Sequence, residues 1–410
     1  MSHAVTKPTD IEIPATSLWA KLPLIGGILA VVGLGATLAM NGGEHPGRAM
    51  FSYLWAFEFV LSIALGGMGV VLIDHLTRAG WSVVVRRVGE TAMATLPLFV
   101  LLAVPLFTIG MHQLYPWSHE TDAILEKKRW FLTEPFFFGR AALYFVIWVV
   151  LSQVLYRASV RRDATADGSP EQKSLTHRMW TVSAGGMALY AMTLSFAAID
   201  WVMSLQPHWY STIWGVYFFA GSILAFYAFS ILVNLGLQKA GLVKTAVTTE
   251  HFHDLGKYMF GFNVFWAYIA FSQFILIWYA NIPEETIFYM ERLEGGWEII
   301  SYALPVLHFF LPFGLLMSRH VKRNRKALGY LAVWILVVHA LDLFWLILPN
   351  FGAHGEGHHT PHFAFTATDG LALVGMLGAF LAAYGFLLRR AKVIAVGDPR
   401  LFESLAHENY

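Results

Sequence analysis

The chain has 410 residues, of which 57% are hydrophobic and only 13% are charged. A soluble domain carries about 25% charged residues, so this composition excludes an ordinary soluble fold and favours a membrane protein. The formal net charge is only +1, and no basic patch of the kind that binds nucleic acid stands out.

Ten apolar stretches are long enough to cross a bilayer, which takes about 20 mostly apolar residues. Each is predicted to be an α-helix, because unpaired backbone groups are not tolerated in lipid. The expected spans are 22–40, 51–74, 91–114, 136–156, 179–204, 212–235, 257–280, 298–317, 327–348 and 370–388. The expected fold is an all-α polytopic membrane protein, a single integral membrane domain over residues 1–410, in which ten spans would accommodate two four-helix bundles and two peripheral helices.

Lysine and arginine are distributed unevenly between the two sides of this arrangement. All but six of the 28 lie in the N-terminus, in every second connection or in the C-terminus; the exceptions are Arg48, Lys127, Lys128, Arg129, Arg140 and Arg292. The positive-inside rule therefore predicts that both termini are cytoplasmic.

The connections between the spans differ in character. The cytoplasmic connection 157–178 is polar and is predicted to be a mobile loop, whereas the outer connections 115–135, 281–297 and 349–368 are large enough to dock partners. The last of these contains four histidines within 354–362. These histidines could bind a metal, but a solvated loop that contacts a partner is the favoured interpretation.

The sequence contains no cysteine. This excludes thiolate-ligated iron–sulfur clusters, covalent haem on a Cys-x-x-Cys-His motif and disulfides. A redox centre held by this chain alone would have to use histidine or be a diffusible quinone.

Ionisable residues inside the spans are the strongest functional signal, because a charge at mid-bilayer costs about 2.5–3.5 kcal/mol on insertion scales. By depth they form a partial ladder from the outer third to the inner rim, and such groups can pass protons. Each could instead be a buried polar group bonded to a neighbouring helix. The candidates for a proton path are Glu58, Asp74, Asp200, His308, His339 and Asp342.

His339 and Asp342 are three residues apart and therefore share one face of the ninth span. His308 is at the middle of the eighth span, so it could meet His339. Two facing histidines could ligate a b-type haem, although only this mid-membrane pair exists and a proton role is favoured.

Two further groups of candidates lie at span ends. Trp201, His208 and Trp209 follow Asp200, and they are weak candidates for quinone contact; the tryptophans could line a lipid-facing cleft or belong to the interfacial aromatic belt. At the cytoplasmic end of the seventh span, 251–254 contains His251, His253 and Asp254, which could admit protons or simply cap the helix.

Two segments resemble a known family. They are 195–212 (SFAAIDWVMSLQPHWYST) and 251–286, which begins HFHDLGK and ends IWYANIPEET. The chain is similar to the ActF family, membrane subunits of alternative complex III, a bacterial quinol:cytochrome c oxidoreductase related to NrfD/PsrC-like membrane proteins. The resemblance covers essentially the whole chain in length and span count.

The resemblance implies ten helices with two four-helix bundles, in the bacterial inner membrane. It also implies that this chain carries no haem or cluster itself, while partner subunits hold haem c and iron–sulfur clusters. Those partners would be an ActC-like membrane subunit, multihaem and monohaem cytochrome c subunits and an iron–sulfur subunit, with a terminal oxidase as a further candidate. Quinol binding and a proton path through Glu58, Asp200, His308, His339 and Asp342 are family expectations.

The leading interpretation is therefore a membrane subunit of a quinol-oxidising respiratory complex. An ion-coupled secondary transporter is the alternative, although paired Gly/Pro-broken spans in matching halves are not apparent. A purely structural subunit, with its polar residues serving as bonds between helices, is the third interpretation.

Overall fold

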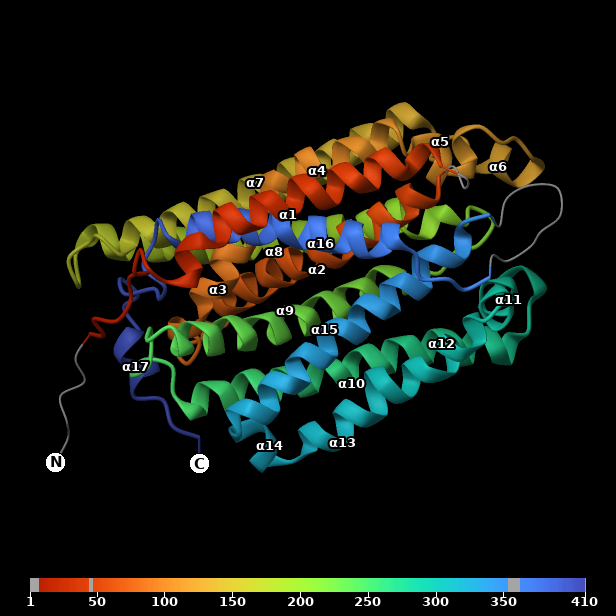
Figure 1. The fold of residues 1–410 in the computed structure, drawn as a ribbon. Helices are drawn as coiled ribbons and strands as arrows, with labels where there is room; N and C mark the ends of the chain where they lie inside the picture. The colour runs from red at the N-terminus through yellow and green to blue at the C-terminus, as the bar shows by residue number, and fades with distance from the viewer. Residues whose placement is uncertain (1–6, 44–46, 353–361, 410) are drawn as a thin grey trace.

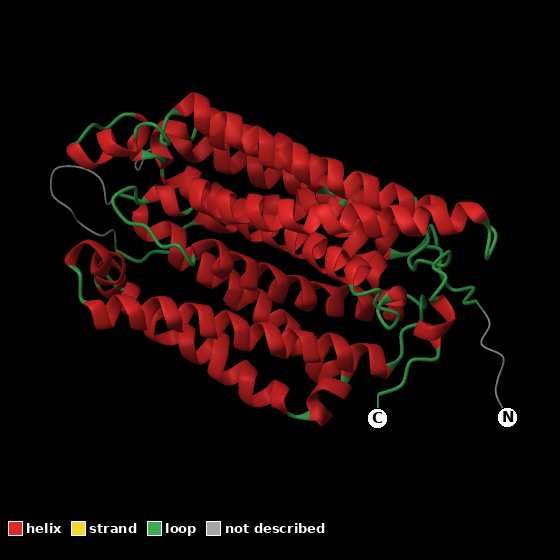
Figure 2. Ribbon diagram, turned by 180° about the vertical axis from the view of Figure 1, so that it is seen from behind, coloured by secondary structure: helices red, strands yellow, loops and turns green. Residues whose placement is uncertain are grey.

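The computed structural model describes residues 7–43, 47–352 and 362–409. Long helices run side by side and antiparallel, joined by loops, and no strand occurs in these residues (Figures 1 and 2). Ten helical segments are long and apolar enough to cross a membrane. The chain is thus an all-α polytopic membrane protein, as predicted.

Eight spans are continuous helices and two are interrupted. The third span is α3 followed by α4, and the eighth is α12, a π-helical turn over Pro305–Phe310 and α13. The helices of the spans are α1 (Leu18–Ala39), α2 (Arg48–Leu76), α3 (Val83–Met93), α4 (Leu96–Thr108), α7 (Glu134–Arg162), α8 (Pro170–Trp201), α9 (Trp214–Lys239), α10 (Thr249–Ala280), α12 (Trp297–Leu304), α13 (Leu311–Met317), α15 (Arg325–Ile347) and α16 (Ala367–Leu388).

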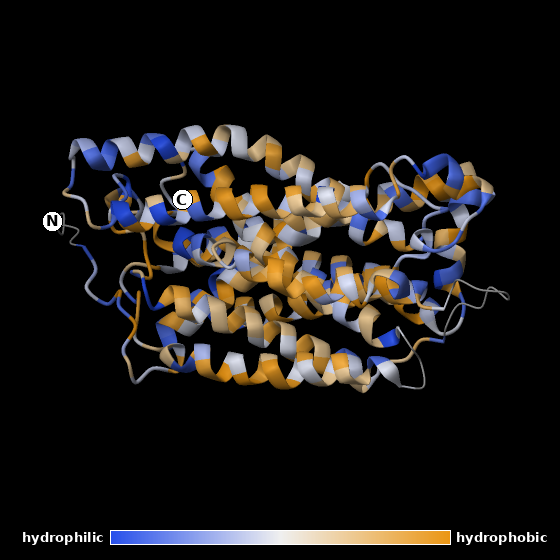
Figure 3. Ribbon diagram, turned by 90° about the horizontal axis from the view of Figure 1, so that it is seen from above, coloured by the Kyte–Doolittle hydropathy of each residue, from blue (hydrophilic) through white to orange (hydrophobic). Residues whose placement is uncertain are grey.

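Short helices lie at the two ends of the bundle. Both described termini, α14 (Arg319–Arg323) and α17 (Leu401–Leu405) lie at one end, which we call the termini end (Figure 1). The opposite end, which we call the loop end, carries α5 (Met111–Leu114), α6 (Ala123–Lys128) and α11 (Pro283–Met290). Hydrophilic residues gather at both ends and hydrophobic ones between them, as a transmembrane arrangement requires (Figure 3).

Two of the predicted boundaries are wrong at the termini end. The third span was expected over 91–114 but begins at Val83, because Arg86, Arg87 and Glu90 continue the helix as buried ion pairs that hydropathy penalises. The connection 157–178 was expected to be a mobile loop, but α7 continues to Arg162 and α8 begins at Pro170. Only a short link remains between these two helices.

The spans form the two predicted four-helix bundles and a peripheral pair. In the first bundle, α2, the third span, α7 and α8 contact one another, and in the second, α9, α10, the eighth span and α15 do so. The bundles meet chiefly through α2 and α9, while α1 and α16 pack along each other and against α2. Nearly every residue of α2 is buried, so this helix is the centre of the molecule.

Glycines permit the closest helix contacts. A Cβ on Gly66 of α2 would lie 2.1 Å from the Ser222 carbonyl oxygen of α9, and one on Gly33 of α1 would lie 2.6 Å from the Gly375 Cα of α16. Small residues at such crossings are typical of membrane helix packing. Gly185 of α8, in contrast, has nothing within 4 Å of its Cβ position.

Arg292 is buried and links two helices at the loop end of the second bundle, so it is not a solvated loop cation. Its guanidinium is buried and donates hydrogen bonds to the carbonyl oxygens of Trp345 and Leu346 at the end of α15, and of Phe288. Burial lowers the pKa of Arg292 to about 10, so it remains charged at neutral pH. A cation at a helix C-terminus also opposes the negative end of the helix dipole.

Candidate functional site

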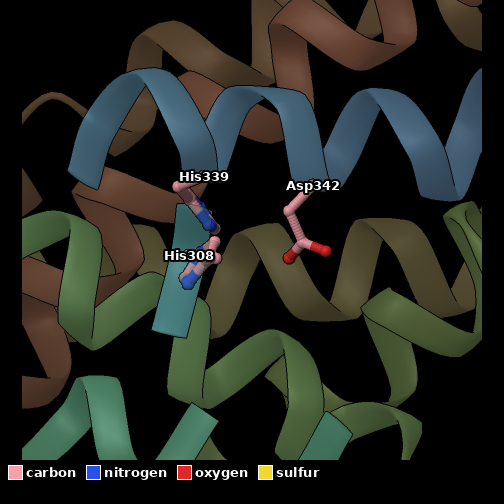
Figure 4. Close-up of side chains that lie close together, drawn as sticks. All are labelled: His308, His339 and Asp342. Atoms are coloured by element: carbon pink, nitrogen blue, oxygen red, sulfur yellow. The ribbon is translucent and has the colours of Figure 1, made fainter. Parts of the chain in front are cut away.

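Three of the predicted residues meet inside the second bundle. One ligand atom each of His308, His339 and Asp342 lies within 4.8 Å of the others, and all three side chains are buried. Figure 4 shows His339 and Asp342 projecting to the same side of α15, where His308 of the eighth span faces His339. The i, i+3 spacing of His339 and Asp342 thus has the predicted result, and His308 meets His339 as its depth in the eighth span allowed.

Asp342 is held by hydrogen bonds from two aromatic side chains. The Tyr217 hydroxyl of α9 donates to Oδ1, and the Trp266 indole N–H of α10 donates to Oδ2 at 3.2 Å. The same Trp266 ring stacks on His308 at a centroid distance of 3.6 Å. These contacts fix the carboxylate and one imidazole relative to each other, because a single indole touches both.

The hydrogen bonds of His339 define its tautomer. The Ser62 hydroxyl of α2 donates to the carbonyl oxygen of Phe59, so its oxygen accepts from His339 Nε2 at 3.0 Å. His339 therefore carries its proton on Nε2, and Nδ1 offers a bare lone pair. His339 Nδ1 and both ring nitrogens of His308 have no hydrogen-bond partner among the described residues.

The π-helical turn explains the position of His308. Pro305 and Pro312 bracket this part of the eighth span and cannot donate the backbone hydrogen bonds of a regular helix. The Asn263 side chain of α10 donates to the His308 carbonyl oxygen within this turn. Such π-turns are frequent at functional sites.

The arrangement is suited to proton transfer through a bound water, because two imidazoles with three unpartnered ring nitrogens and a carboxylate meet at one buried place in the described structure. Two imidazoles and a carboxylate could also hold a divalent transition metal. A b-type haem between His308 and His339 fits less well, because His339 Nε2 is hydrogen-bonded to Ser62 and the Trp266 ring stacks on His308.

Glu58 and Asp200 belong to a second cluster, in the first bundle near the loop end. The Arg140 guanidinium of α7 binds both oxygens of Asp200, and the Tyr144 hydroxyl donates to it as well. Glu58 Oε1 is buried without a partner among the described residues. Burial, and then the neighbouring carboxylates of Glu58 and Asp200, raise the pKa of Tyr115 well above its ordinary value.

These contacts give Asp200 and Glu58 different characters. Asp200 is a partner in a bidentate buried ion pair, which supports the interpretation of a bond between helices. Glu58 has no cation beside it and is free to take up a proton. Sequence reasoning missed Arg140, because it counted this residue as a cation of an outer connection.

The prediction that Trp201 and Trp209 face the lipid or the membrane interface is wrong. Trp201 and Trp209 are 1% and 3% exposed, so they neither line a lipid-facing cleft nor belong to the interfacial belt. Trp201 packs against Trp148 and Phe145 in the first bundle, and Trp209 stacks on Phe288 at 4.2 Å. His208 is exposed, and its Nε2 lies 3.1 Å from Asp122 Oδ2.

A buried ion network at the termini end contains residues that sequence analysis overlooked. Three arginines and three carboxylates alternate in it across α3, α7 and the C-terminal segment: Arg86 with Glu90 and Asp398, Arg87 with Glu90 and Asp163, and Arg162 with Asp398. Their charges balance. Asp398 lies more than 300 residues from Arg86 in sequence, so spacing could not reveal their contact.

Asp74 adjoins this network without joining it. It lines a small crevice at the seam of the two bundles, together with Ser82, Arg86, Tyr227 and Ser230, and no ion pair reaches it within the described chain. Its neighbour His75 is buried with Nε2 unpartnered in the same part of the structure. The three arginines of the network already pair with three other carboxylates, so Asp74 has no ion-pair partner of its own among the described residues.

His251 caps its helix and anchors the C-terminal segment. Its Nδ1 accepts from the Thr248 backbone N–H in a capping box, and its Nε2 lies 3.1 Å from the Ser404 carbonyl oxygen. Asp254 pairs with Lys257 and His407. His253 Nδ1 is buried without a partner among the residues described. His251 therefore caps the helix, whereas Asp254 helps to anchor the C-terminal segment through His407.

The predicted ladder is interrupted between Ser62 and Asp74. These residues are twelve positions apart on α2, about 18 Å at 1.5 Å per residue, and residues 63–73 are all apolar. Tyr190 of α8 reaches this interval, where its hydroxyl is buried, unpartnered in the described structure and close to Gly69. Sequence analysis missed Tyr190, although a tyrosine inside a span was a visible signal.

The histidines of 354–361 lie outside the described residues, so both interpretations of the histidine-rich stretch 354–362, a metal site and the favoured solvated loop, stay predictions. The fold and its buried polar clusters define an integral, multi-pass α-helical membrane protein. Neither a protein-family model nor a curated protein sequence matches the chain significantly.

Proposed function

We propose that this chain is a membrane subunit of a bacterial quinol:cytochrome c oxidoreductase of the alternative complex III type, in which it scaffolds the complex and conducts protons. The observation that carries the proton role is the meeting of His308, His339 and Asp342 with Tyr217 and Ser62 in the buried interior. The respiratory assignment rests on the resemblance of 195–212 and 251–286 to the ActF family.

The chemistry of quinol oxidation motivates this role. A quinol releases two protons as it is oxidised, so acceptors near the site of oxidation and a path away from it are useful. Glu58 and the His308–His339–Asp342 cluster would handle protons in the half of the membrane nearer the loop end, and Asp74 would do so at the termini end. The apolar interval beside Tyr190 would separate the two half-paths.

The proposal assigns no redox cofactor to this chain. Quinone would contact it at the loop end beside the exposed His208, and not at Trp201 or Trp209, whose indole rings are buried. Haem c and iron–sulfur clusters would belong to partner subunits, beside an ActC-like membrane subunit and a terminal oxidase. The complex would lie in the bacterial inner membrane with both termini of this chain cytoplasmic.

Co-purification from native membranes tests the respiratory assignment. The tagged chain is extracted in mild detergent, and the same fraction is analysed by mass spectrometry, haem staining and a quinol:cytochrome c assay. We expect c-type haem and iron–sulfur subunits with quinol oxidation. Recovery of a colourless chain that is inactive with quinol would overturn the assignment and favour the ion-coupled transporter.

A structural subunit is the second candidate, and the Arg140–Asp200 pair specifically favours it. The two candidates differ in what His339→Gln does to the assembled complex. Loss of proton coupling with subunit composition unchanged supports conduction, whereas loss of assembly with normal coupling in the surviving complex supports the structural role.

A further inference from the structure

The termini end of the peripheral α1–α16 pair carries an unpaired cluster of cations. Arg389 Nη1 donates to the Ala20 carbonyl oxygen at 3.1 Å, which places it beside Lys21, and Arg390 and Lys392 follow along the chain. None of Lys21, Arg389, Arg390 and Lys392 forms an ion pair within the described residues.

Several other arginines at this end are neutralised by carboxylates. Arg161 pairs with Glu171, Arg323 with Glu250, and Arg400 with Glu403, in addition to the three arginines of the buried network. The cations of the α1–α16 pair have no such carboxylate partner in the described structure, and Arg389 reaches from α16 to α1.

Below these cations, exposed apolar residues continue along both helices. Leu24, Ile25 and Ile28 follow Lys21 at intervals of three, four and seven residues, so they share its face of α1, and they are 70%, 40% and 56% exposed. On α16, the Arg390 guanidinium lies 4.0 Å from the ring centroid of Phe386, which is 46% exposed. Each helix thus presents an exposed apolar stripe with a basic residue at its termini end.

We propose that this surface binds an anionic phospholipid. The headgroup phosphate would contact Lys21, Arg390 and Lys392, and the acyl chains would lie along Leu24, Ile28 and Phe386. Basic groups at a helix end attract anionic headgroups, while the exposed stripes suit hydrocarbon and not water. The apolar stripes favour a lipid over free phosphate, which would use the cations alone.

The test compares lipid retention by two triple variants of the purified full chain. Lys21→Gln/Arg390→Gln/Lys392→Gln removes the proposed site. Lys173→Gln/Arg178→Gln/Lys239→Gln removes the same charge from exposed, unpaired cations on α8 and α9 at the same end. Phosphatidylglycerol and phosphatidylcholine of equal chain length are added, and bound lipid is counted by native mass spectrometry.

We expect the first variant to lose phosphatidylglycerol affinity by about a hundredfold, from three cations that each contribute roughly fivefold near an anionic group. The control variant should retain it, and phosphatidylcholine should bind both weakly. Equal losses in the two variants would overturn the site in favour of general surface charge. Displacement of phosphatidylglycerol by millimolar inorganic phosphate would overturn the lipid assignment in favour of a phosphate site.

Folding is monitored separately, so that a damaged protein is not mistaken for a lost site. The unfolding temperature of the first variant in phosphatidylcholine should equal that of the unmodified chain, because the substituted side chains are exposed or half-buried and make no ion pairs in the described structure. Unchanged phosphatidylglycerol binding by this folded variant would end the proposal.

Discussion

At the scale of single residues, the buried carboxylates of the spans differ in whether a cation neutralises them. Asp200 is neutralised by Arg140, whereas Glu58 and Asp74 have no cation of their own, and Asp342 is bonded only by neutral donors. Burying a charge without a partner is costly, so such a group is usually kept for a purpose. The uncompensated carboxylates are therefore the preferred targets for substitution.

Asp342→Asn should abolish most proton movement while leaving the fold intact. Asparagine retains an acceptor for Tyr217 or Trp266 but cannot take up and release a proton. We expect proton transfer in reconstituted vesicles to fall about 10²-fold, the lower end of what a positioned proton-transfer group contributes. Tyr217→Phe, which leaves a carboxylate oxygen unpaired, should instead cost about 1–3 kcal/mol of stability. Normal proton transfer by a stably folded Asp342→Asn chain would remove this residue from the path.

Arg140 and Asp200 should show the non-additivity of a buried ion pair. Arg140→Gln leaves the Asp200 carboxylate buried without its cation, at a cost of about 3–5 kcal/mol. Arg140→Leu/Asp200→Leu removes both charges and should cost less than either single substitution. Thermal unfolding of the single and double variants in detergent measures this difference. A double variant less stable than both single variants would contradict a purely structural pair.

At the scale of elements, charges and glycines decide how the helices meet. The buried arginines of α3 extend the third span beyond its apolar part, since they pair with Glu90, Asp163 and Asp398. The glycines of α2 allow α9 to lie directly against it. The C-terminal segment ties these elements together, as Asp398 binds arginines from both α3 and α7.

Gly66→Ala tests the contact between the two bundles. A Cβ at this position would lie 2.1 Å from a backbone carbonyl oxygen of α9, so the helices would have to separate. Overpacking typically costs about 1–3 kcal/mol, and a backbone neighbour should place this variant at the upper end. Gly185→Ala is the matched control, because nothing lies within 4 Å of its Cβ position. Equal unfolding temperatures of the two variants would show that the bundles can separate freely.

Asp398 should make attachment of the C-terminal segment sensitive to acid. Burial alone would raise the pKa of its carboxyl group, but Arg86 and Arg162 hold the pKa well below its ordinary value. A depressed carboxyl pKa contributes stability that is present above the unfolded pKa of about 3.9 and is lost as the pH falls toward the folded pKa. We therefore expect proteolysis of 391–409 to accelerate as the pH falls below about 4.

The matched variant for this prediction is Asp398→Asn. It should release the segment already at neutral pH, with a loss of about 3–5 kcal/mol, because two buried arginines lose their carboxylate. Its proteolysis should then depend less on pH in the acid range, since the titrating group is gone. A variant with unchanged acid sensitivity would assign that sensitivity to other groups.

At the scale of the whole molecule, two four-helix bundles share a seam that is formed chiefly by α2 and α9. The His308–His339–Asp342 cluster and Asp74 adjoin this seam at different depths. The absence of cysteine makes the orientation of the chain directly measurable. A single introduced cysteine would be the only thiol.

Labelling should place the termini end in the cytoplasm. Lys173→Cys lies at the termini end and Glu284→Cys at the loop end, both at exposed positions. With a membrane-impermeant maleimide on intact cells, we expect Glu284→Cys to react and Lys173→Cys to react only after permeabilisation. The reverse pattern would overturn the orientation predicted from lysine and arginine.

The sequence by itself determined the all-α class, the ten spans and the shared face of His339 and Asp342. It could do so because the hydrophobic thickness of a bilayer and the helical repeat act locally along the chain. The tertiary structure alone decided that His308 joins this pair, that Arg140 neutralises Asp200 and that Asp398 completes the arginine network. These contacts join helices that are distant in sequence. Packing in three dimensions selects which side chains meet, and the local periodicity of the sequence carries no information about that choice.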